Sequence, residues 1–318
     1  MLNNIVDYHV HTSRCGHATG RMAEYVEAAM AAGLAELGFS DHIPMYWLPG
    51  DQPDPTSAMA MSELESYVAD VQRLQAQYKG FPIRLGLEAD YIPGGEGELA
   101  RILALYPWDY VIGSVHFMDD WNFDHPAYVA RYAEWDIDLL YRRFFDLELA
   151  AIRSGFFDIM GHLDLIKKFG HRPTGDLREI YAAVADAAAA AGVAVELSTA
   201  GLRKPVHEYY PHQQLLAECA RRGVPLVLSS DAHAPGEVAW GFPEARAHAL
   251  ATGFTTVAKF AGRRRTLLPR AYVRGRPRWE APGSFVFTVP LPSSRPDMRR
   301  CRGCRPWLGR QTARSQPS

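Results

Sequence analysis

The sequence predicts an α/β protein in which seven successive βα units surround a parallel sheet. Short apolar runs of four to six residues alternate along the chain with longer segments of helical period. Several helical segments end at a glycine that is followed within a few residues by the next apolar run, as a helix C-cap requires. Histidine, aspartate and glutamate recur where the apolar runs end, and the C-terminal ends of the strands are where an α/β barrel carries its chemistry.

The expected strands are the apolar runs, and each is followed by a polar side chain. In chain order they are residues 5–9, 35–40, 83–88, 110–115, 158–162, 193–197 and 226–230. The expected helices lie between them, at residues 22–32, 63–78, 137–153, 177–191 and 212–222. Gly33, Gly155, Gly192 and Gly223 close four of these helices. We expect a last extended piece, residues 255–260, to add an edge strand or a closing segment.

Length and composition set the class of protein. The 318 residues suffice for one α/β barrel, which reaches about 250 residues as a single domain, and for a remainder. The content of 47% apolar and 22% charged residues is that of an ordinary globular protein. We find no apolar run of membrane-spanning length and no secretory signal segment, and the four cysteines are too few for a disulfide framework. The sequence therefore predicts a cytoplasmic protein that does not bind membranes.

The chain divides at about residue 270. We expect residues 1–270 to form the barrel and residues 271–318, which are rich in Pro, Arg, Gly and Ser, to be a disordered tail. Cys301 and Cys304 have the spacing of a zinc knuckle, but no second pair of ligands lies near them, so we expect no metal there. The tail carries ten arginines and two acids, which leaves residues 1–270 with a net charge of -10. The barrel therefore has no electrostatic reason to bind nucleic acid.

Side chains that bind metal ions follow every expected strand. They lie at the strand end or within three residues of it: His9, His11, His42, Glu88, His116, His162, Glu196, Asp231 and His233. His17 adds another imidazole on the loop after the first strand. Because the C-terminal ends of barrel strands converge on one face, these side chains would meet in space. Burying them together without a cation would be costly, whereas metal ions neutralise the acids and use the lone pairs of the imidazoles.

The ligand types indicate the metal and the reaction. Imidazole and carboxylate without thiolate suit Zn, Mn or Fe, and we interpret Cys15 as a small packed residue. Nine or ten candidate ligands are too many for one tetrahedral ion, so two to three divalent metal ions are expected. Such clusters generate hydroxide near neutral pH and hold the oxygens of a phosphoryl group during its displacement. Hydrolysis of phosphate esters follows, although the same ligands could also hydrolyse an amide or a lactone.

Six short motifs in chain order resemble those of the PHP (polymerase and histidinol phosphatase) superfamily, over residues 3–269. They are Asp7-Tyr8-His9-Val10-His11-Thr12, Asp41-His42, Gly86-Leu87-Glu88, Gly113-Ser114-Val115-His116, Gly161-His162-Leu163-Asp164 and Ser230-Asp231-Ala232-His233. Three further segments are similar to the monofunctional histidinol-phosphatase branch: residues 114–117 with 121–124, residues 197–203, and residues 262–266. The resemblance implies a distorted (β/α)7 TIM-like barrel with a trinuclear metal site at the C-terminal strand ends.

The resemblance also implies which residues hold each metal. His9, His11, Glu88 and Asp231 would hold the first ion, and His17, His42 and His233 the second. Glu88, His116 and His162 would hold the third, so that Glu88 bridges two ions. No ligand position is missing or substituted in this chain, so the resemblance implies an active enzyme. The tail is the one departure, because a barrel of this type would end near Pro269.

The activity implied is hydrolysis of L-histidinol phosphate to L-histidinol and phosphate, a late step of histidine biosynthesis. We expect Arg203 to bind the phosphate, because guanidinium matches phosphate oxygens with two parallel hydrogen bonds, with Lys167, Lys168 and Arg172 as weaker candidates. Asp41 is a candidate proton donor to the leaving group, or it orients His42. Glu196 would lie outside the metal set, either behind a ligand or against the substrate amine.

Several alternatives stay open from the sequence. The aromatic loop at residues 46–55 could cover the substrate together with Trp121 and Phe123, or these side chains could pack against the barrel rim. The runner-up function is a PHP-type phosphoesterase that acts on another small phosphate ester or a nucleotide. A function of a different class is RNA binding or protein interaction through the arginine-rich tail, whose aromatic residues could stack on bases. The sequence does not fix the metal or the oligomeric state.

Overall fold

The structure is a computed structural model, and it describes residues 4–269 of the chain. The predicted tail at residues 271–318, with its Cys301 and Cys304 pair and its suggested role in RNA binding, lies outside the described residues. Among the described residues, no helix combines the length and the apolar character needed to cross a membrane.

Seven parallel strands form the central sheet. They are β1 (Val6–Asp7), β2 (Glu36–Phe39), β3 (Ile83–Asp90), β4 (Tyr110–Ser114), β7 (Ile159–Met160), β8 (Ala194–Ser198) and β9 (Leu226–Ser229). Neighbours in space follow chain order, as β1-β2-β3-β4-β7-β8-β9. The first and last strands approach each other just beyond their ends, where the His11 amide donates to the Ala232 carbonyl at 3.0 Å and the Ala232 amide to the His9 carbonyl at 3.1 Å. The predicted barrel of seven units is therefore confirmed, and it is nearly closed.

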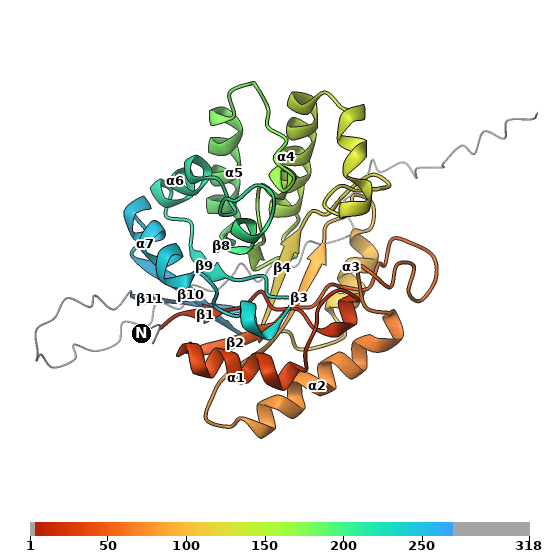
Figure 1. Cartoon of the computed structure of the whole chain (residues 1–318), viewed down its shortest axis with the longest axis vertical. Coiled ribbons are helices and arrows are strands. Elements are labelled where there is room, and N and C mark those ends of the chain that lie inside the picture. The colour runs from red at the N-terminus through yellow and green to blue at the C-terminus, as the bar shows by residue number, and fades with distance from the viewer. Residues whose placement is uncertain (1–3, 270–318) are drawn as a thin grey trace, which may run out of the picture. The chain divides into compact units, whose positions relative to one another are not determined.

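Residues 4–269 contain seven α-helices. They cover the outside of the strands (Figure 1). They are α1 (Met22–Ala32), α2 (Leu64–Gln77), α3 (Glu96–Leu103), α4 (Ile137–Ser154), α5 (Arg178–Ala191), α6 (Gln213–Arg221) and α7 (Phe242–Thr252). The five predicted helices are present, with ends that differ by a few residues at most. The sequence analysis missed α3, which has only 8 residues, and α7, whose buried face is mostly alanine and so gives a weak apolar period.

Two strands, β1 and β7, have only two residues where five were predicted. Strand β1 pairs with β2 only through Val6 and Asp7, and β7 has two residues. Beyond these pairs the chain leaves the ladder, so His9, His11 and His162 lie past the last strand residues rather than in the sheet. A second departure is the short antiparallel hairpin of β5 (Phe117–Met118) and β6 (Trp121–Asn122), which lies in the loop after β4.

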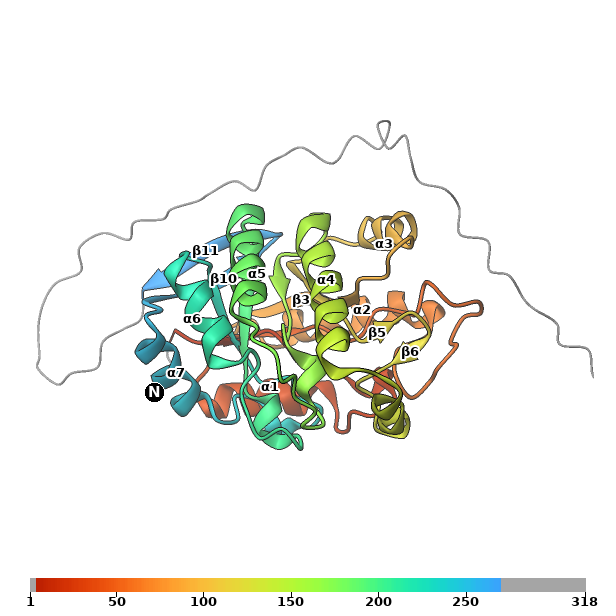
Figure 2. The same cartoon turned by 90° about the horizontal axis from the view of Figure 1, so that it is seen from above.

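A C-terminal hairpin closes the end of the barrel where the strands begin. Strand β10 (Thr256–Ala261) pairs antiparallel with β11 (Arg264–Pro269), so the extended piece predicted near residue 255 does not join the main sheet (Figure 2). Phe260 packs edge-on against Tyr8, with ring centroids 6.4 Å apart. Arg263 donates to the Phe156 carbonyl and pairs with Asp158 at 2.7 Å, both at the start of β7. This end is filled with side chains, which leaves the opposite end for the site.

Tyr110 fills the barrel interior and explains a glycine in one of the sequence motifs. Its ring stacks on Tyr8, and its hydroxyl donates to the Tyr8 carbonyl at 2.6 Å. A Cβ atom on Gly86 would lie 2.3 Å from this ring, which is closer than any stable contact. Glycine at position 86 therefore lets the ring cross the barrel just below Glu88.

Candidate metal centre

All nine predicted ligands gather at the C-terminal ends of the strands. His9 and His11 follow β1, His42 follows β2, Glu88 lies in β3, His116 follows β4, His162 follows β7, Asp231 and His233 follow β9, and His17 comes from the loop after β1. Their rings lie close together, with centroids 4.1 Å apart for His11 and His233 and 5.0 Å apart for His116 and His162. The predicted convergence of the strand ends therefore occurs.

Glu88 lies at the centre of this cluster, and one of its oxygens faces three imidazoles. Its Oε2 is 3.0 Å from His42 Nδ1, 3.2 Å from His9 Nε2 and 3.5 Å from His11 Nε2. Burial alone would raise the pKa of Glu88, but the charges of the surrounding imidazoles hold it well below its usual range. The carboxylate is thus ionised although its side chain is only 1% exposed.

The other oxygen of Glu88 faces a different pair of imidazoles. Its Oε1 lies 3.0 Å from His162 Nε2 and 3.6 Å from His116 Nε2, and it accepts a hydrogen bond of 2.6 Å from the Ser114 hydroxyl. The two oxygens of one carboxylate therefore belong to two groups of nitrogen atoms. This arrangement is the one that a bridging ligand between two ions requires.

Asp231 completes a second group of possible ligands. Its Oδ1 lies 3.1 Å from His11 Nε2 and 3.8 Å from His9 Nε2. The ligand atoms of these three residues all lie within 4.8 Å of one another, which is close enough to hold one ion. Asp231 also adopts a positive φ of 50°, which is uncommon for a residue other than glycine and is found most often at functional sites.

A third group consists of imidazoles alone: His17, His42 and His233, whose ligand atoms also lie within 4.8 Å of one another. Nδ1 of His17 faces the Cys15 and Thr56 carbonyls at 2.9 Å each, so its Nε2 is left for a metal. Burial, together with repulsion from neighbouring imidazoles, lowers the pKa of His17 to about 4 and that of His233 well below its usual range. Both rings are therefore neutral at pH 7 and offer lone pairs.

Two carboxylates behind the cluster orient its histidines. Glu196 lies 2.8 Å from His9 Nδ1, and Asp90 lies 2.9 Å from His116 Nδ1. A carboxylate on the Nδ1 side fixes the ring and turns Nε2 toward the cluster, as the outer partners of metal-bound histidines do. The sequence analysis missed Asp90, although its position two residues after Glu88 places both on the same face of β3.

Asp41 is held by neighbours rather than free to donate a proton. Its Oδ1 lies 3.5 Å from His11 Nδ1 and accepts from the His42 amide at 2.9 Å. Its Oδ2 accepts from the Thr12 amide at 3.1 Å and from the Thr12 hydroxyl. These contacts argue against the predicted role as a general acid and fit the other role, which was to orient ligands. Glu196 is likewise engaged, because its second oxygen accepts from the His162 amide at 3.2 Å, so it does not face a substrate amine.

Arg203 lies beside the cluster but outside its cavity. Its Nη2 donates to the Ser230 and Asp231 carbonyls at 2.8 and 3.1 Å, and its Nε pairs with Glu237 at 3.3 Å. Nη1 is buried and has no hydrogen-bond partner among residues 4–269. The guanidinium thus supports the segment that carries Asp231.

Lys167 and Trp121 were predicted to contact substrate, and the structure argues against both. The Lys167 ammonium is 1% exposed and bonds to Asp164 Oδ2 at 2.8 Å and to the Tyr209 carbonyl at 2.7 Å, so it has no access to the site. Trp121 is 1% exposed and stacks on Trp135. Phe123, a candidate for covering the substrate together with Trp121, is fully buried as well. Arg172, a weaker candidate for the phosphate contact, pairs with Glu208 at 2.6 Å. The environment of these side chains depends on how they pack, and the sequence alone does not show the packing.

A cavity of about 420 Å³ opens beside the imidazoles. Its lining includes the imidazoles of His17, His42, His116, His162 and His233, together with Trp47, Phe117, Asp124, Lys168 and Lys204. Trp47 comes from the aromatic loop at residues 46–55, so at least this residue of the loop borders the site. The volume suits a small metabolite rather than a macromolecule.

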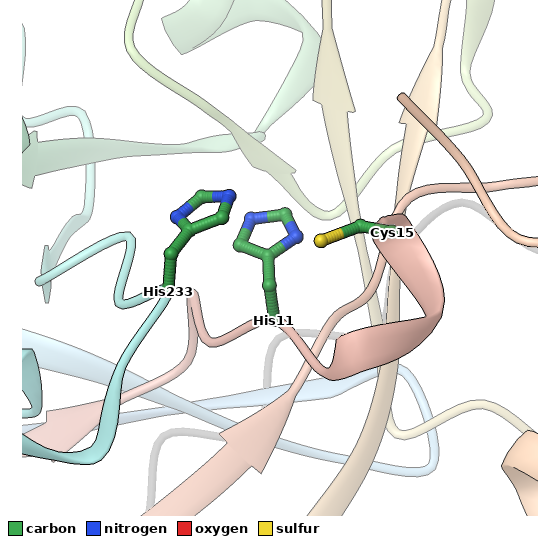
Figure 3. A group of neighbouring side chains, drawn as sticks. All are labelled: His11, Cys15 and His233. Carbon is green, nitrogen blue, oxygen red and sulfur yellow. The ribbon is translucent and has the colours of Figure 1, made fainter. Parts of the chain in front are cut away.

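Cys15 lies near the cluster without belonging to it. Its sulfur is within 4.8 Å of nitrogen atoms of His11 and His233. Figure 3 shows that the Cys15 sulfur points toward the His11 ring, with His233 beyond that ring. Burial raises the pKa of the Cys15 thiol to about 12, which keeps it protonated. The interpretation of Cys15 as a packed residue fits this geometry.

The cluster also leaves buried polar atoms that a metal ion would satisfy. Nε2 of His9, His11 and His233 and Oε2 of Glu88 are buried without a hydrogen-bond partner in the described part of the chain. Buried polar atoms are nearly always paired, and unpaired ones cost free energy. All four belong to the groups whose geometry suits a divalent ion, so the donor set fits metal binding.

Comparison with known proteins agrees with this chemistry. A family profile described as the PHP domain matches residues 7–200. The probable histidinol-phosphatase of Deinococcus radiodurans is 46% identical over 246 residues, which cover 77% of this chain and 92% of that protein. The histidinol-phosphatase of Bacillus subtilis is 30% identical over 260 residues, covering 74% and 96%. A solved structure of histidinol phosphate phosphatase from Lactococcus lactis, in complex with zinc, L-histidinol and phosphate, matches with a TM-score of 0.70 and 25% identity, covering 82% of this chain and 98% of that one.

The first prediction concerns Gly16, which holds the His17 loop against the loop at Pro55. Gly16 has a φ of 82°, and a Cβ atom there would lie 1.9 Å from the Pro55 carbonyl oxygen. Gly16→Ala should therefore move His17 away from Thr56 and lower the number of ions retained after dialysis, as measured by elemental analysis. Gly33→Ala is the matched control, because it has a φ of 74° and open space around the site of the new Cβ. Both variants should lose about 1 to 2 kcal/mol of stability from the left-handed backbone, and equal ion contents in the two would contradict the role of the loop contact.

The second prediction is that metal binding releases protons. Burial lowers the pKa of His11 and His116, but adjacent carboxylates raise it to about 9 and about 10. Without metal, both rings are therefore protonated at pH 7 and must lose a proton to become ligands. Apparent metal affinity should rise with pH between 6 and 9 and level off above the raised pKa values. Titration calorimetry in two buffers with different ionisation enthalpies should detect the released protons, and identical apparent enthalpies in both buffers would show that the rings are already neutral.

Proposed function

The chain belongs to the PHP domain family, as its motifs predicted, and we propose that it hydrolyses L-histidinol phosphate to L-histidinol and inorganic phosphate with the help of two to three divalent ions. The observation that carries this proposal is Glu88, whose two oxygens each face a separate group of imidazoles. The support from relatives is that the proteins from Deinococcus radiodurans and Bacillus subtilis carry this activity in their names, and that the Lactococcus lactis structure contains zinc, L-histidinol and phosphate.

The residues that would hold the ions follow from the groups of ligand atoms. His9, His11 and Asp231 would bind one ion together with Glu88, and the three imidazoles of His17, His42 and His233 would bind another. His116 and His162 would share Glu88 with a third. Zn, Mn and Fe all suit these ligands. When bound, such ions lower the pKa of water toward neutrality and neutralise the oxygens of the phosphoryl group.

A cation that borders the cavity would hold the phosphate oxygens. Lys204 borders the cavity at the end of the segment after β8. Arg203 precedes it, but its guanidinium lies outside the cavity and supports the segment that carries Asp231. An ammonium donor stabilises the charge on the equatorial oxygens, which is the main requirement of phosphoryl transfer.

The aromatic part of the cavity lining suits the imidazole of the substrate. Trp47 and Phe117 meet edge to face there, with ring centroids 5.1 Å apart, and both border the cavity. A small aromatic ring can stack on or pack edge-on against such a pair. A phosphate ester without an aromatic group would leave these surfaces in contact with water.

The reaction belongs to histidine biosynthesis, and we therefore place it in the cytoplasm. The alternative substrate is another small phosphate ester or a nucleotide, which the same ions could hydrolyse. The size of the cavity is compatible with either, so the substrate test must compare them directly.

The third prediction tests the function through Glu88. The purified protein should release phosphate from L-histidinol phosphate, lose this activity on chelation, and regain it when Zn, Mn or Fe is added. Glu88→Gln removes a charge shared by two ions, so kcat/KM should fall by more than the roughly 10-fold to 100-fold that losing an outer partner of a ligand costs. Glu179→Gln makes the same change on the exposed face of α5 and should leave the rate unchanged.

Two outcomes would overturn the proposal. Full activity in a preparation shown to be free of metal would exclude the ions. Faster hydrolysis of nucleoside monophosphates than of L-histidinol phosphate, with the same dependence on Glu88, would instead favour the alternative substrate.

A further inference from the structure

Asp124 carries a carboxylate that the metal centre does not use. It follows β6 in the hairpin loop after β4, and it borders the cavity together with His116 and His162. Its Oδ2 accepts a hydrogen bond of 2.9 Å from the Lys168 ammonium, which also donates to the Asp124 backbone carbonyl at 2.7 Å. Within residues 4–269, no donor reaches the other oxygen, Oδ1. One oxygen of Asp124 is thus fixed by Lys168, and the other is open to the cavity.

The other carboxylates that border the cavity already have partners. Glu88 and Asp231 lie among the imidazoles, and Asp90 is paired with Nδ1 of His116. Asp124 belongs to none of the groups of described residues that could hold a metal ion. Its open oxygen therefore faces the space that a substrate would occupy, next to the metal centre but outside it.

The charge of this oxygen sets a requirement on the ligand. A carboxylate close to a bound phosphate repels it, and Lys168 offsets only part of that repulsion because it engages one oxygen. A cationic group on the substrate would offset the rest. In L-histidinol phosphate the ammonium group is on the carbon next to the one that bears the ester oxygen, so it lies close to the phosphate. A phosphate ester without this ammonium group would leave the Oδ1 atom of Asp124 without a partner.

We propose that Asp124 determines specificity by binding the ammonium group of the substrate through its Oδ1 atom while Lys168 holds the carboxylate in place. This proposal rests on the function proposed above. It replaces Glu196, whose two oxygens are engaged by His9 and His162, as the contact for the amine. Selectivity then has two parts. Binding of the amine to Asp124 favours substrates that carry it, and an Oδ1 atom left without a partner disfavours phosphates that lack it.

The fourth prediction compares two substrates in two proteins. The substrates are L-histidinol phosphate and 3-(imidazol-4-yl)propyl phosphate, which differs only in lacking the amino group. Asp124→Asn keeps the shape of the side chain and removes its charge. It should lower kcat/KM for L-histidinol phosphate roughly 10-fold to 150-fold, as the loss of a hydrogen bond between charged groups implies, and leave the rate on the analogue unchanged or raised. Asp120→Asn is the matched control, because Asp120 lies in the same hairpin with its side chain 86% exposed, and both rates should stay unchanged.

Binding to the unaltered protein tests the same idea without any variant. L-Histidinol should bind the metal-loaded protein at least about 10-fold more tightly than 3-(imidazol-4-yl)propan-1-ol, as measured by calorimetry. Equal affinities would overturn the role of Asp124, and so would equal losses of rate on both substrates in Asp124→Asn. A protein that hydrolyses both phosphates at equal rates contradicts only this proposal. A protein that releases no phosphate from L-histidinol phosphate contradicts the proposed function instead.

Discussion

A buried carboxylate surrounded by imidazoles is the constraint on which the rest of the site depends. Glu88 is ionised and almost without contact to water, and five histidine nitrogens lie within 3.6 Å of its two oxygens. A buried charge of this kind is stable only when cations surround it, and the protonated rings of a metal-free protein provide one solution and divalent ions another. The outer carboxylates Asp90 and Glu196 follow from the same constraint, because each fixes the ring whose Nε2 faces Glu88.

The side chains that pack the barrel and the side chains that could bind metal lie in different parts of it. Tyr8, Tyr110 and Phe260 fill the barrel interior, and the hairpin of β10 and β11 covers the end where the strands begin. The short ladders of β1 and β7 release the chain early at the other end, so that the histidines after them turn toward Glu88 rather than pointing along the sheet. The packed end therefore fixes the positions of the strands, and the strand ends fix the positions of the ligands.

The sequence predicted the fold and the convergence of the candidate ligands, because both depend on position along the chain. Parallel strands converge at one end, so a histidine after each strand must approach the others whatever the packing. The substrate contacts could not be predicted in this way, since they depend on which neighbour a side chain finds. Lys167 and Lys168 are adjacent in sequence, yet Lys167 is buried against Asp164 while Lys168 reaches Asp124 at the cavity. Trp121 and Trp47 differ in the same manner, the first packed inside and the second at the cavity.

Anomalous X-ray diffraction from crystals of the manganese-loaded protein is the most direct test of the central claim that Glu88 bridges separate ions. The account predicts at least two anomalous peaks, one on each side of the Glu88 carboxylate, with His9 and His11 next to one and His116 and His162 next to the other. A single peak bound by only one oxygen of Glu88, or peaks outside the imidazole cluster, would contradict it.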